Sequence, residues 1–475
     1  MMKFKKTKII ATLGPASSSK EMIKKLIKSG VDVFRVNFSH ATHDEVERIV
    51  DDVNDLRKEL GSNVTLLGDL QGPKIRIGEL ENDIKLKKNQ SLSICSNLSE
   101  CNGIDKIFIS YLSFAKDVNP GENILVDDGK LIFKVISTNK KDTVNVKAVQ
   151  EGVLRPKKGV NLPNTKISQP ALTEKDIDDA KFAVKKSFDW IALSFVRSKK
   201  DVLQLRELIE SQCDYHIPII SKIEKPQAIE KIDSIIKVSN GIMVARGDLG
   251  IEIPAEEVPL NQKKIVAKCK KRGIPVIIAT QMMESMIDSL TPSRAEVNDV
   301  ANSVMDGADA IMLSGETSMG KYPCEVVKKI EDIIYGVEDS PLIKIPIDLP
   351  EIKSDRLITK SICKNAATIA SEIGASAICT LTNSGYTGWQ ISSWRPSSLV
   401  VVFTSNKKIL TQLNLLWGIK GVYYNNFEST DKTVEEVNSL ALENKFIKKG
   451  DYVINLAAMP IYEKGQVNTL RITKI

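Results

Sequence analysis

Two carboxylates and two cations follow short apolar runs, at positions where they could share one site. Lys222 and Glu224 end the run IPIISKIE, and Arg246 and Asp248 end the run GIMVARGD. Strand residues two apart project from the same face, so each pair is expected to point the same way. If the two runs form neighbouring strands, about 4.8 Å apart, Glu224 and Asp248 could share a Mg²⁺ ion, which prefers carboxylate and substrate oxygens.

The same spacing recurs at the ends of two further apolar runs. Arg35, Asn37 and Ser39 alternate in VDVFRVNFS, and Ser314 and Glu316 close ADAIMLSGE. A single polar residue at a strand end often only caps a helix or pairs locally. Recurrence after several runs indicates instead one site at the edge where parallel strands end.

The residue types indicate metal-assisted chemistry on an anionic, phosphorylated substrate. Arg35, Arg76 and Lys222 are cations of the kind that bind a phosphoryl group. Thr280, near the end of IPVIIATQ, supplies a hydroxyl that could relay a proton. No Cys–His or Ser–His pair is evident, which disfavours nucleophilic acyl transfer.

Eight apolar runs, each followed by a helix-like segment, are expected to position these residues. The count predicts an α/β fold with a TIM (β/α)8 barrel, and an open doubly wound sheet is the competing arrangement. The runs are KIIATL (8–13), VDVFRVNFS (31–39), VTLLGDL (64–70), DWIALSF (189–195), IPIISKIE (217–224), GIMVARGD (241–248), IPVIIATQ (274–281) and ADAIMLSGE (308–316).

The alternation is interrupted once and pauses again after residue 335. Residues 72–168 contain short alternating runs separated by Gly, Asn and Asp, which predicts an inserted small β-barrel lid domain. The prolines of DSPLIKIPIDLPEIKSD indicate a linker. We therefore expect a barrel domain of residues 1–71 and 169–340, a lid domain of residues 72–168, and a C-terminal α/β domain of residues 341–475.

Composition narrows the class of protein. The 475 residues are 42% hydrophobic and 27% charged, which excludes disordered, collagenous and disulfide-scaffold chains. The net charge of +7 is small and its basic residues are scattered, so no nucleic-acid partner is expected. No run is long enough for a membrane helix. Seven cysteines without a CxxC pair, with only three histidines, make a zinc site unexpected and suit the cytoplasm.

A series of segments matches one protein family in the same order along the chain. They are TKIIATLGPAS, FRVNFSH, GDLQGPKIRIG, KKGVNLP, IISKIEKP, GIMVARGDLGIEIP, IATQMMESM, TPSRAEVNDVANSVMDGADAIMLSGET and YPCEV. Through them the sequence resembles the pyruvate kinases over nearly its whole length. The resemblance implies transfer of the phosphoryl group of phosphoenolpyruvate to ADP, which gives ATP and pyruvate in the final step of glycolysis. It also implies a homotetramer, the usual assembly of the family.

The resemblance assigns roles to the residues named above. Glu224 and Asp248 hold Mg²⁺, for which Mn²⁺ could substitute, and Lys222 faces the transferring phosphoryl group and the developing enolate. Arg35 and Arg76 neutralise phosphate oxygens. Substrate binding is further implied for Ala245, Arg246, Gly247, Asp248 and Thr280. Protonation of enolpyruvate is implied for Thr280, with water ordered by Ser314 and Glu316. ADP, with a second Mg²⁺, is implied to bind near Pro15, His40, Arg76 and Lys158.

One departure from many family members concerns K⁺. Those members carry a glutamate at the position of Lys74 and depend on K⁺. Asn37, Ser39 and Asp69 could still cage a monovalent cation, but the Lys74 ammonium would repel K⁺ and replace its charge. Alternatively, Lys74 only lies on the surface of the lid. We predict that K⁺ is not required.

A second departure concerns the segment LTNSGYTGWQ (381–390), which could bind an anion at a helix start or merely cap that helix. The resemblance favours an effector phosphate loop. A lysine of members that respond to fructose 1,6-bisphosphate is Asn383 here, and the facing loop offers Lys464 but no arginine. We therefore expect a sugar monophosphate or AMP as effector, or none. The loop residues are Thr382, Asn383, Ser384, Gly385 and Thr387.

Two alternatives to a pyruvate kinase use the same residues. A barrel lyase or aldolase would share Glu224 and Asp248, but it would need neither the lid nor the cations Lys222 and Arg76. A non-catalytic metabolite sensor would keep the fold and lose the chemistry. Arg35, Lys222, Glu224, Asp248, Thr280 and Glu316 are all present, which argues against a sensor.

Overall fold

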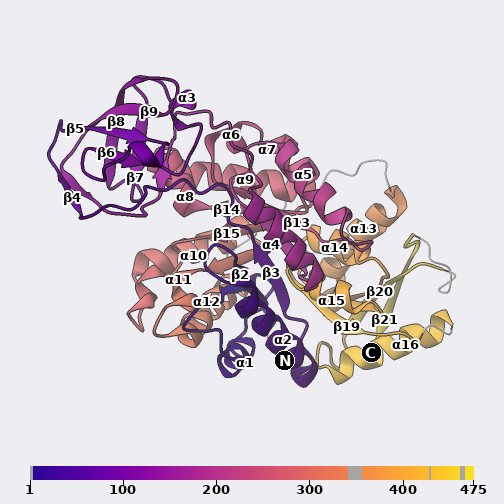
Figure 1. The fold of residues 1–475 in the computed structure, drawn as a ribbon. Helices are drawn as coiled ribbons and strands as arrows, with labels where there is room; N and C mark the ends of the chain where they lie inside the picture. Colours follow the sequence, from indigo (N-terminus) through magenta and orange to yellow (C-terminus); the bar gives the residue numbers. More distant parts are fainter. Residues whose placement is uncertain (1–3, 341–355, 427–428, 460–465) are drawn as a thin grey trace.

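The computed structural model describes residues 4–340, 356–426, 429–459 and 466–475. Most of the expected linker and Lys464 lie outside the described residues. Three parts follow one another across the molecule, with the barrel between a sheet formed by residues 72–168, here called the lid segment, and the C-terminal domain (Figure 1). Within the described ranges, no helix is both long and apolar enough to span a bilayer.

Eight parallel strands close into a barrel, which confirms the predicted (β/α)8 fold. Their order around the barrel is β1-β16-β15-β14-β13-β12-β3-β2. Every residue of these eight strands is buried except Asn37, the last residue of β2, as expected for strands covered on both faces. The strands are β1 (Lys8–Thr12), β2 (Val33–Asn37), β3 (Thr65–Asp69), β12 (Trp190–Leu193), β13 (Ile219–Ile223), β14 (Gly241–Ala245), β15 (Val276–Ala279) and β16 (Ala310–Leu313).

Helices surround the barrel and begin at residues suited to the task. Thr42, Thr173 and Ser293 each form a capping box, in which side chain and backbone satisfy each other's free groups at the helix start. The helices are α1 (Lys20–Lys28), α2 (His43–Leu60), α4 (Glu174–Lys185), α5 (Lys199–Glu210), α6 (Pro226–Glu230), α7 (Ile232–Val238), α8 (Arg246–Glu252), α9 (Val258–Arg272), α10 (Arg294–Asp306), α11 (Gly315–Ser318) and α12 (Pro323–Glu338).

All eight strands end before the predicted runs do, and for β14 and β16 this corrects the spacing argument. β14 ends at Ala245, so Arg246 and Asp248 lie in the first turn of α8. β16 ends at Leu313, and Glu316 lies in α11. These pairs are therefore placed by helix starts and not by strand alternation.

The lid segment is a curled sheet with its own apolar core, which confirms the predicted inserted β domain. Six strands follow the order β11-β7-β8-β9-β5-β6, and β10 pairs with β4. The elements are β4 (Ile84–Leu86), β5 (Ser91–Cys95), the short helix η1 (Leu98–Glu100), β6 (Lys106–Phe108), α3 (Phe114–Asp117), β7 (Asn123–Val126), β8 (Leu131–Thr138), β9 (Thr143–Ala148), β10 (Gly152–Leu154) and β11 (Val160–Asn161).

The C-terminal domain is the expected α/β unit. Its sheet has the order β19-β18-β17-β20-β21, and only β21 runs antiparallel to its neighbour. The elements are α13 (Leu357–Ile373), β17 (Ala377–Leu381), α14 (Tyr386–Ser393), β18 (Leu399–Thr404), α15 (Lys407–Leu413), β19 (Ile419–Tyr423), α16 (Thr430–Glu443), β20 (Tyr452–Ala457) and β21 (Thr469–Lys474).

Buried aspartates fasten the C-terminal domain to the end of the barrel where the strands begin. Asp32, Asp189 and Asp309 each precede a strand and accept a backbone N–H from the neighbouring strand. Asp189 also accepts a hydrogen bond from Thr411 (2.6 Å) and pairs with Arg57 and Lys408. Arg395 of the C-terminal domain lies 2.7 Å from Asp309. The stacked rings of Trp190 and Trp389, 5.7 Å apart, extend the same contact.

We expect Asp189→Ala to lower the free energy of unfolding by about 3 kcal/mol or more, because it leaves buried cations without their partner. Burial alone would raise the pKa of Asp189, but Arg57 and Lys408 outweigh it and hold the pKa below its usual value. The stabilisation is therefore complete above the ordinary carboxyl pKa of about 4 and is lost as the pH falls through the lower, folded-state value.

Urea unfolding at pH 7 and near pH 3 measures both effects. The difference between the wild type and Asp189→Ala should shrink at the lower pH, and exposed Asp51→Ala is the control. A variant as stable as the wild type at pH 7 would contradict the assigned role.

Candidate active site

A buried cluster of alternating charges lies where the barrel strands end. Lys222, on β13, places its Nζ atom 3.0 Å from Glu224 Oε1 and 3.3 Å from Asp69 Oδ1, and it donates to Ser194 Oγ at 2.8 Å. Arg35, on β2, donates from Nε to Asp69 Oδ2 at 2.7 Å. The structure therefore brings together Lys222, Glu224 and Arg35, and it adds Asp69, which was expected to lie with Asn37 and Ser39 around a monovalent cation.

The cluster favours the charged forms of Lys222 and Asp69. Burial alone would lower the pKa of Lys222, but the carboxylates of Asp69 and Glu224 outweigh it and raise that pKa above its ordinary value. Burial alone would raise the pKa of Asp69, and Lys222 and Arg35 more than reverse the effect. At neutral pH the site therefore presents two fixed cations beside a carboxylate.

Glu224 has the surroundings of a metal ligand. It is 1% exposed, and its second oxygen accepts a hydrogen bond from the backbone N–H of Phe195 at 2.6 Å. Burial raises the pKa of Glu224, and the charge of half-buried Asp248 raises it further. A divalent cation would relieve this repulsion, and two carboxylates are the donor set that Mg²⁺ takes beside substrate oxygens. The residues present therefore fit the metal.

Thr280 and the start of α8 are joined directly. The N–H of Gly247 donates to Thr280 Oγ1 at 2.7 Å, and Arg246 donates to the carbonyl of Thr280 at 2.7 Å and to Asp299 at 2.7 Å. Thr280 has φ +72°, which is strained for a β-branched residue. The Arg246 side chain therefore holds the loop after β15. Ala245 and Gly247 lie on either side of Arg246, where β14 ends and α8 begins.

Glu316 is held by backbone groups from two loops. One carboxylate oxygen accepts from Met283 N at 3.1 Å and the other from Ser314 N at 2.6 Å, and the side chain is 2% exposed. Glu316 thus fixes the loops after β15 and β16 relative to each other. The Glu316 carboxylate is therefore used to hold the loops that carry Ser314 and Thr280, and both of its oxygens are engaged.

A group of cations surrounds His40 on the loop after β2. Partial burial lowers the pKa of His40, and Lys74, Arg76 and Arg35 lower it further. Arg76 belongs to the lid segment, and its Nη1 atom donates to the carbonyl oxygen of Lys157 in the same segment at 3.1 Å. Of the other residues expected to contact the nucleotide, Lys158 pairs with Asp127 (2.9 Å) and Pro15 is exposed.

The residues expected to cage a monovalent cation are partly engaged elsewhere. Asn37 Oδ1 accepts the backbone N–H of Ser39 at 3.1 Å. Both oxygens of Asp69 face cations, as described above. Lys74 is exposed and lies with Asp248 along a cavity of about 60 Å³ between the lid segment and the barrel.

The expected effector loop forms the turn that starts α14. Gly385 has φ +79°, and its N–H donates to Thr382 Oγ1 at 3.0 Å. Asn383 and Ser384 are exposed, whereas Thr387 is buried.

Sequence reasoning missed three residues that touch the cluster or its neighbours. Ser194 and Phe195 follow β12 and contact Lys222 and Glu224. Lys225 forms a buried ion pair with Glu252, described below. The run DWIALSF carried a weak signal, a serine at a strand end, but nothing in it shows that a backbone N–H reaches Glu224.

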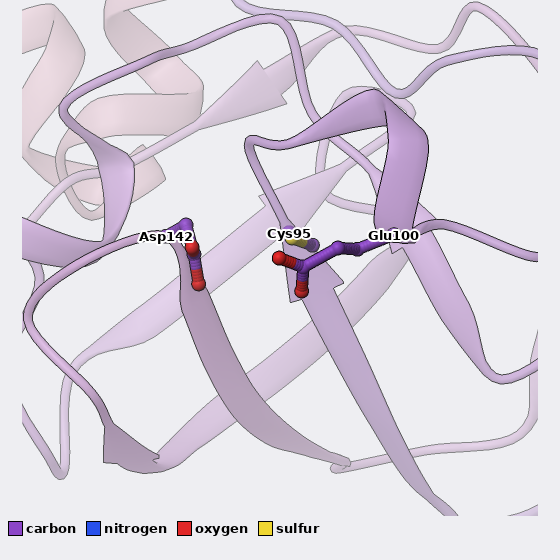
Figure 2. Close-up of side chains that lie close together, drawn as sticks. All are labelled: Cys95, Glu100 and Asp142. Carbon is purple, nitrogen blue, oxygen red and sulfur yellow. The ribbon is translucent and has the colours of Figure 1, made fainter.

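A second group of potential metal ligands lies on the lid segment. Ligand atoms of Cys95, Glu100 and Asp142 lie within 4.8 Å of one another, at the end of β5, on η1 and before β9 (Figure 2). Lys106 already pairs with Glu100 at 2.6 Å, and its pKa is raised by that contact and by the neighbouring groups. We therefore assign this group no metal.

The comparisons with known proteins agree with this geometry. The family model of the pyruvate kinase barrel domain matches residues 4–327, and that of the pyruvate kinase alpha/beta domain matches residues 360–473. A pyruvate kinase of Geobacillus stearothermophilus is 40% identical over 98% of this chain and 80% of its own. Pyruvate kinase 2 of Synechocystis is 39% identical over 95% of this chain and 76% of its own.

A solved structure extends the agreement to three dimensions. A pyruvate kinase from Cryptosporidium parvum superposes with a TM-score of 0.92 and 34% sequence identity, covering 99% of this chain and 96% of its own. The family models together span most of the sequence, and the relatives named above are well over 30% identical to it. The chain belongs to the pyruvate kinase family.

Proposed function

We propose that the Lys222 cluster is the catalytic centre of this pyruvate kinase, which uses phosphoenolpyruvate and ADP to form pyruvate and ATP. The observation that carries this proposal is the position of Lys222, buried at a strand end between Asp69 and Glu224 and held protonated by both. A fixed cation in a buried site stabilises charge as it develops, since little reorganisation is needed.

Each group then has a defined task. Glu224 and Asp248 hold Mg²⁺, or Mn²⁺ in its place, and the bound metal neutralises phosphoryl and enolate oxygens. Lys222 and Arg35 neutralise the transferring phosphoryl group from the barrel side, and Arg76 does so from the lid segment. Ala245, Arg246 and Gly247 orient the substrate carboxylate at the start of α8, beside Asp248.

Protonation of the enolate follows transfer. Thr280 Oγ1 accepts the N–H of Gly247. It therefore lies beside the start of α8, where we place the substrate carboxylate. We assign the proton route to Thr280 and Ser314, with Glu316 fixing the two loops that carry them. ADP, with a second Mg²⁺, enters on the side of Pro15, His40, Arg76 and Lys158, where the cations around His40 favour phosphates.

K⁺ independence is a further part of the proposal. Asp69 is paired with Arg35 and Lys222, so a monovalent cation would have to share a carboxylate that two cations already neutralise. Partial burial lowers the pKa of His40, and the charges of Lys74, Arg76 and Arg35 lower it further, which supports a positive field on this side that disfavours K⁺. Asn37, Ser39 and Asp69 remain the residues that would form the monovalent site, with Lys74 as its substitute.

The remaining expectations concern regulation and assembly. We propose an effector of the sugar-monophosphate or AMP type, or none, at Thr382, Asn383, Ser384, Gly385 and Thr387, since the described part of this loop carries no cation. We also propose a cytoplasmic homotetramer. We propose a barrel domain of residues 1–71 and 169–340, a lid domain of residues 72–168 and a C-terminal domain of residues 341–475.

Lys222→Met should lower kcat at least a hundredfold, because the transition state loses its buried cation. The variant should remain folded, since Met fills a similar volume. Pyruvate formation from phosphoenolpyruvate and ADP measures the effect, with circular dichroism for folding. Lys268→Met, at an exposed ion pair, is the control. Near wild-type turnover of Lys222→Met would rule out its assigned role.

Wild-type enzyme should turn over in buffer free of K⁺ and Na⁺, and added K⁺ should change the rate less than about twofold. Lys74→Glu should create a K⁺ requirement, because it exchanges the ammonium for a carboxylate that K⁺ can neutralise. Initial rates against K⁺ concentration test both statements. A wild-type rate that rises tenfold or more with K⁺ would refute the proposal.

The effector proposal is tested by titration at low phosphoenolpyruvate concentration. Ribose 5-phosphate or AMP should change the rate more than fructose 1,6-bisphosphate does, or none should act. Thr382→Ala and Ser384→Ala should remove any response that is seen. Stronger activation by the bisphosphate would contradict the proposal, because that ligand carries a second phosphate for which the described loop offers no cation.

A further inference from the structure

A side-chain contact crosses from the lid segment to the barrel beside the two metal carboxylates. Asn161, on β11, donates from Nδ2 to Glu252 Oε1 at 2.8 Å, and Lys225 Nζ lies 2.5 Å from the same oxygen. The side chains of Lys225 and Glu252 are 9% and 1% exposed. Among the residues that the structure describes, this is the one hydrogen bond between a side chain of the lid segment and a side chain of the barrel.

The barrel partners are attached directly to the carboxylates. Lys225 follows Glu224 in the chain, and Glu252 lies one helical turn after Asp248 on α8. In Figure 1, α8 lies next to the base of the lid segment. Asn161, Lys225 and Asp248 also line the same cavity between the two parts. The contact thus links the position of the lid segment to the elements that carry both metal ligands.

Energetics make this contact more than an incidental one. Lys225 and Glu252 are a buried ion pair, and the second oxygen of Glu252 is buried without a hydrogen-bond partner in the described residues. A buried carboxylate with an unsatisfied oxygen gains more from a further donor than an exposed one does. Asn161 supplies a donor from the lid segment to Oε1, the oxygen that Lys225 also contacts, and without it the buried carboxylate would keep Lys225 alone. Lys225 also lies 5.6 Å from the ring centre of Phe195, whose N–H holds Glu224.

The two chain connections of the lid segment leave a role for such a contact. Gly72, on the outgoing connection, has φ +70° and donates its N–H to Asp176 at 2.9 Å. On the returning connection, Arg197 donates to the carbonyls of Ile167 (2.6 Å) and Gln169 (2.5 Å). These contacts hold the ends of the lid segment, and they leave its tilt about the two ends to contacts such as that of Asn161.

We propose that Asn161, Glu252 and Lys225 form a lid latch that sets the tilt of the lid segment over the nucleotide side of the site. The three are positioning residues, and the latch rests on the proposed placement of ADP between the lid segment and the barrel. Without the latch, fewer molecules hold the lid segment in the binding-competent arrangement, and the apparent affinity for nucleotide falls by that fraction.

Asn161→Ala tests the latch without leaving a new charge. We expect the KM for ADP to rise roughly 5- to 30-fold, with a smaller change in the KM for phosphoenolpyruvate and a melting temperature close to the wild-type value. Asn145→Ala is the matched control, since Asn145 lies in the lid segment and its side chain bonds, among the described residues, with Ser93 and Ser137 of the same segment. An unchanged KM for ADP in Asn161→Ala would overturn the proposal.

Hydrogen–deuterium exchange of the enzyme without ligands separates the latch from a direct contact between Asn161 and ADP. The latch predicts that residues 155–168 exchange faster in Asn161→Ala than in the wild type. In Asn145→Ala these residues should exchange at the wild-type rate. Exchange equal to that of the wild type would overturn the latch, even if the KM for ADP rose. This measurement does not depend on turnover, and inactivity of the wild type would instead count against the proposed function.

Discussion

The buried arrangement of Lys222 between Asp69 and Glu224 constrains the whole end of the barrel at which the strands finish. Taking these charges out of water costs several kcal/mol for each ion, roughly, unless opposite charges and hydrogen bonds surround them. Arg35, Ser194 and the N–H of Phe195 supply those partners. Strands β2, β3, β12 and β13 must therefore keep their register, because each contributes one member of the cluster or the residue that follows it.

The opposite end of the barrel, where the strands begin, also contains buried carboxylates that are paired with cations. Asp32, Asp189 and Asp309 each accept a backbone N–H from a neighbouring strand and face a cation. For Asp189 and Asp309, some of those cations come from the C-terminal domain. The acidic groups thus close the hydrogen bonding at the strand starts and fasten a second domain there. β2, which follows Asp32, carries Arg35, and β12, which follows Asp189, leads into Ser194, so the same strands connect the two ends of the barrel.

Sequence patterns predicted the barrel because eight buried parallel strands require eight strongly apolar runs, and these are visible without structure. They also predicted Lys222, Glu224 and Arg35, since polar residues at the ends of such runs are rare unless a site needs them. The limits of β14 and β16 could not be predicted in this way. In the sequence, Arg246, Asp248 and Glu316 look as if they continue a strand. The backbone instead turns into a helix, which begins at Arg246 in one case and at Gly315 in the other.

Contacts made by backbone groups were beyond sequence reasoning for a different reason. The Phe195 N–H reaches Glu224 only because Phe195 adopts φ +52°, an unfavourable conformation for a bulky residue. Its ring lies against Gly72, where a side chain would collide with it. Two residues later, Arg197 binds the returning connection of the lid segment. A loop of four residues, 194–197, therefore contacts Lys222, Glu224 and both connections of the lid segment, so one strained stretch of backbone joins the charge cluster to the lid segment.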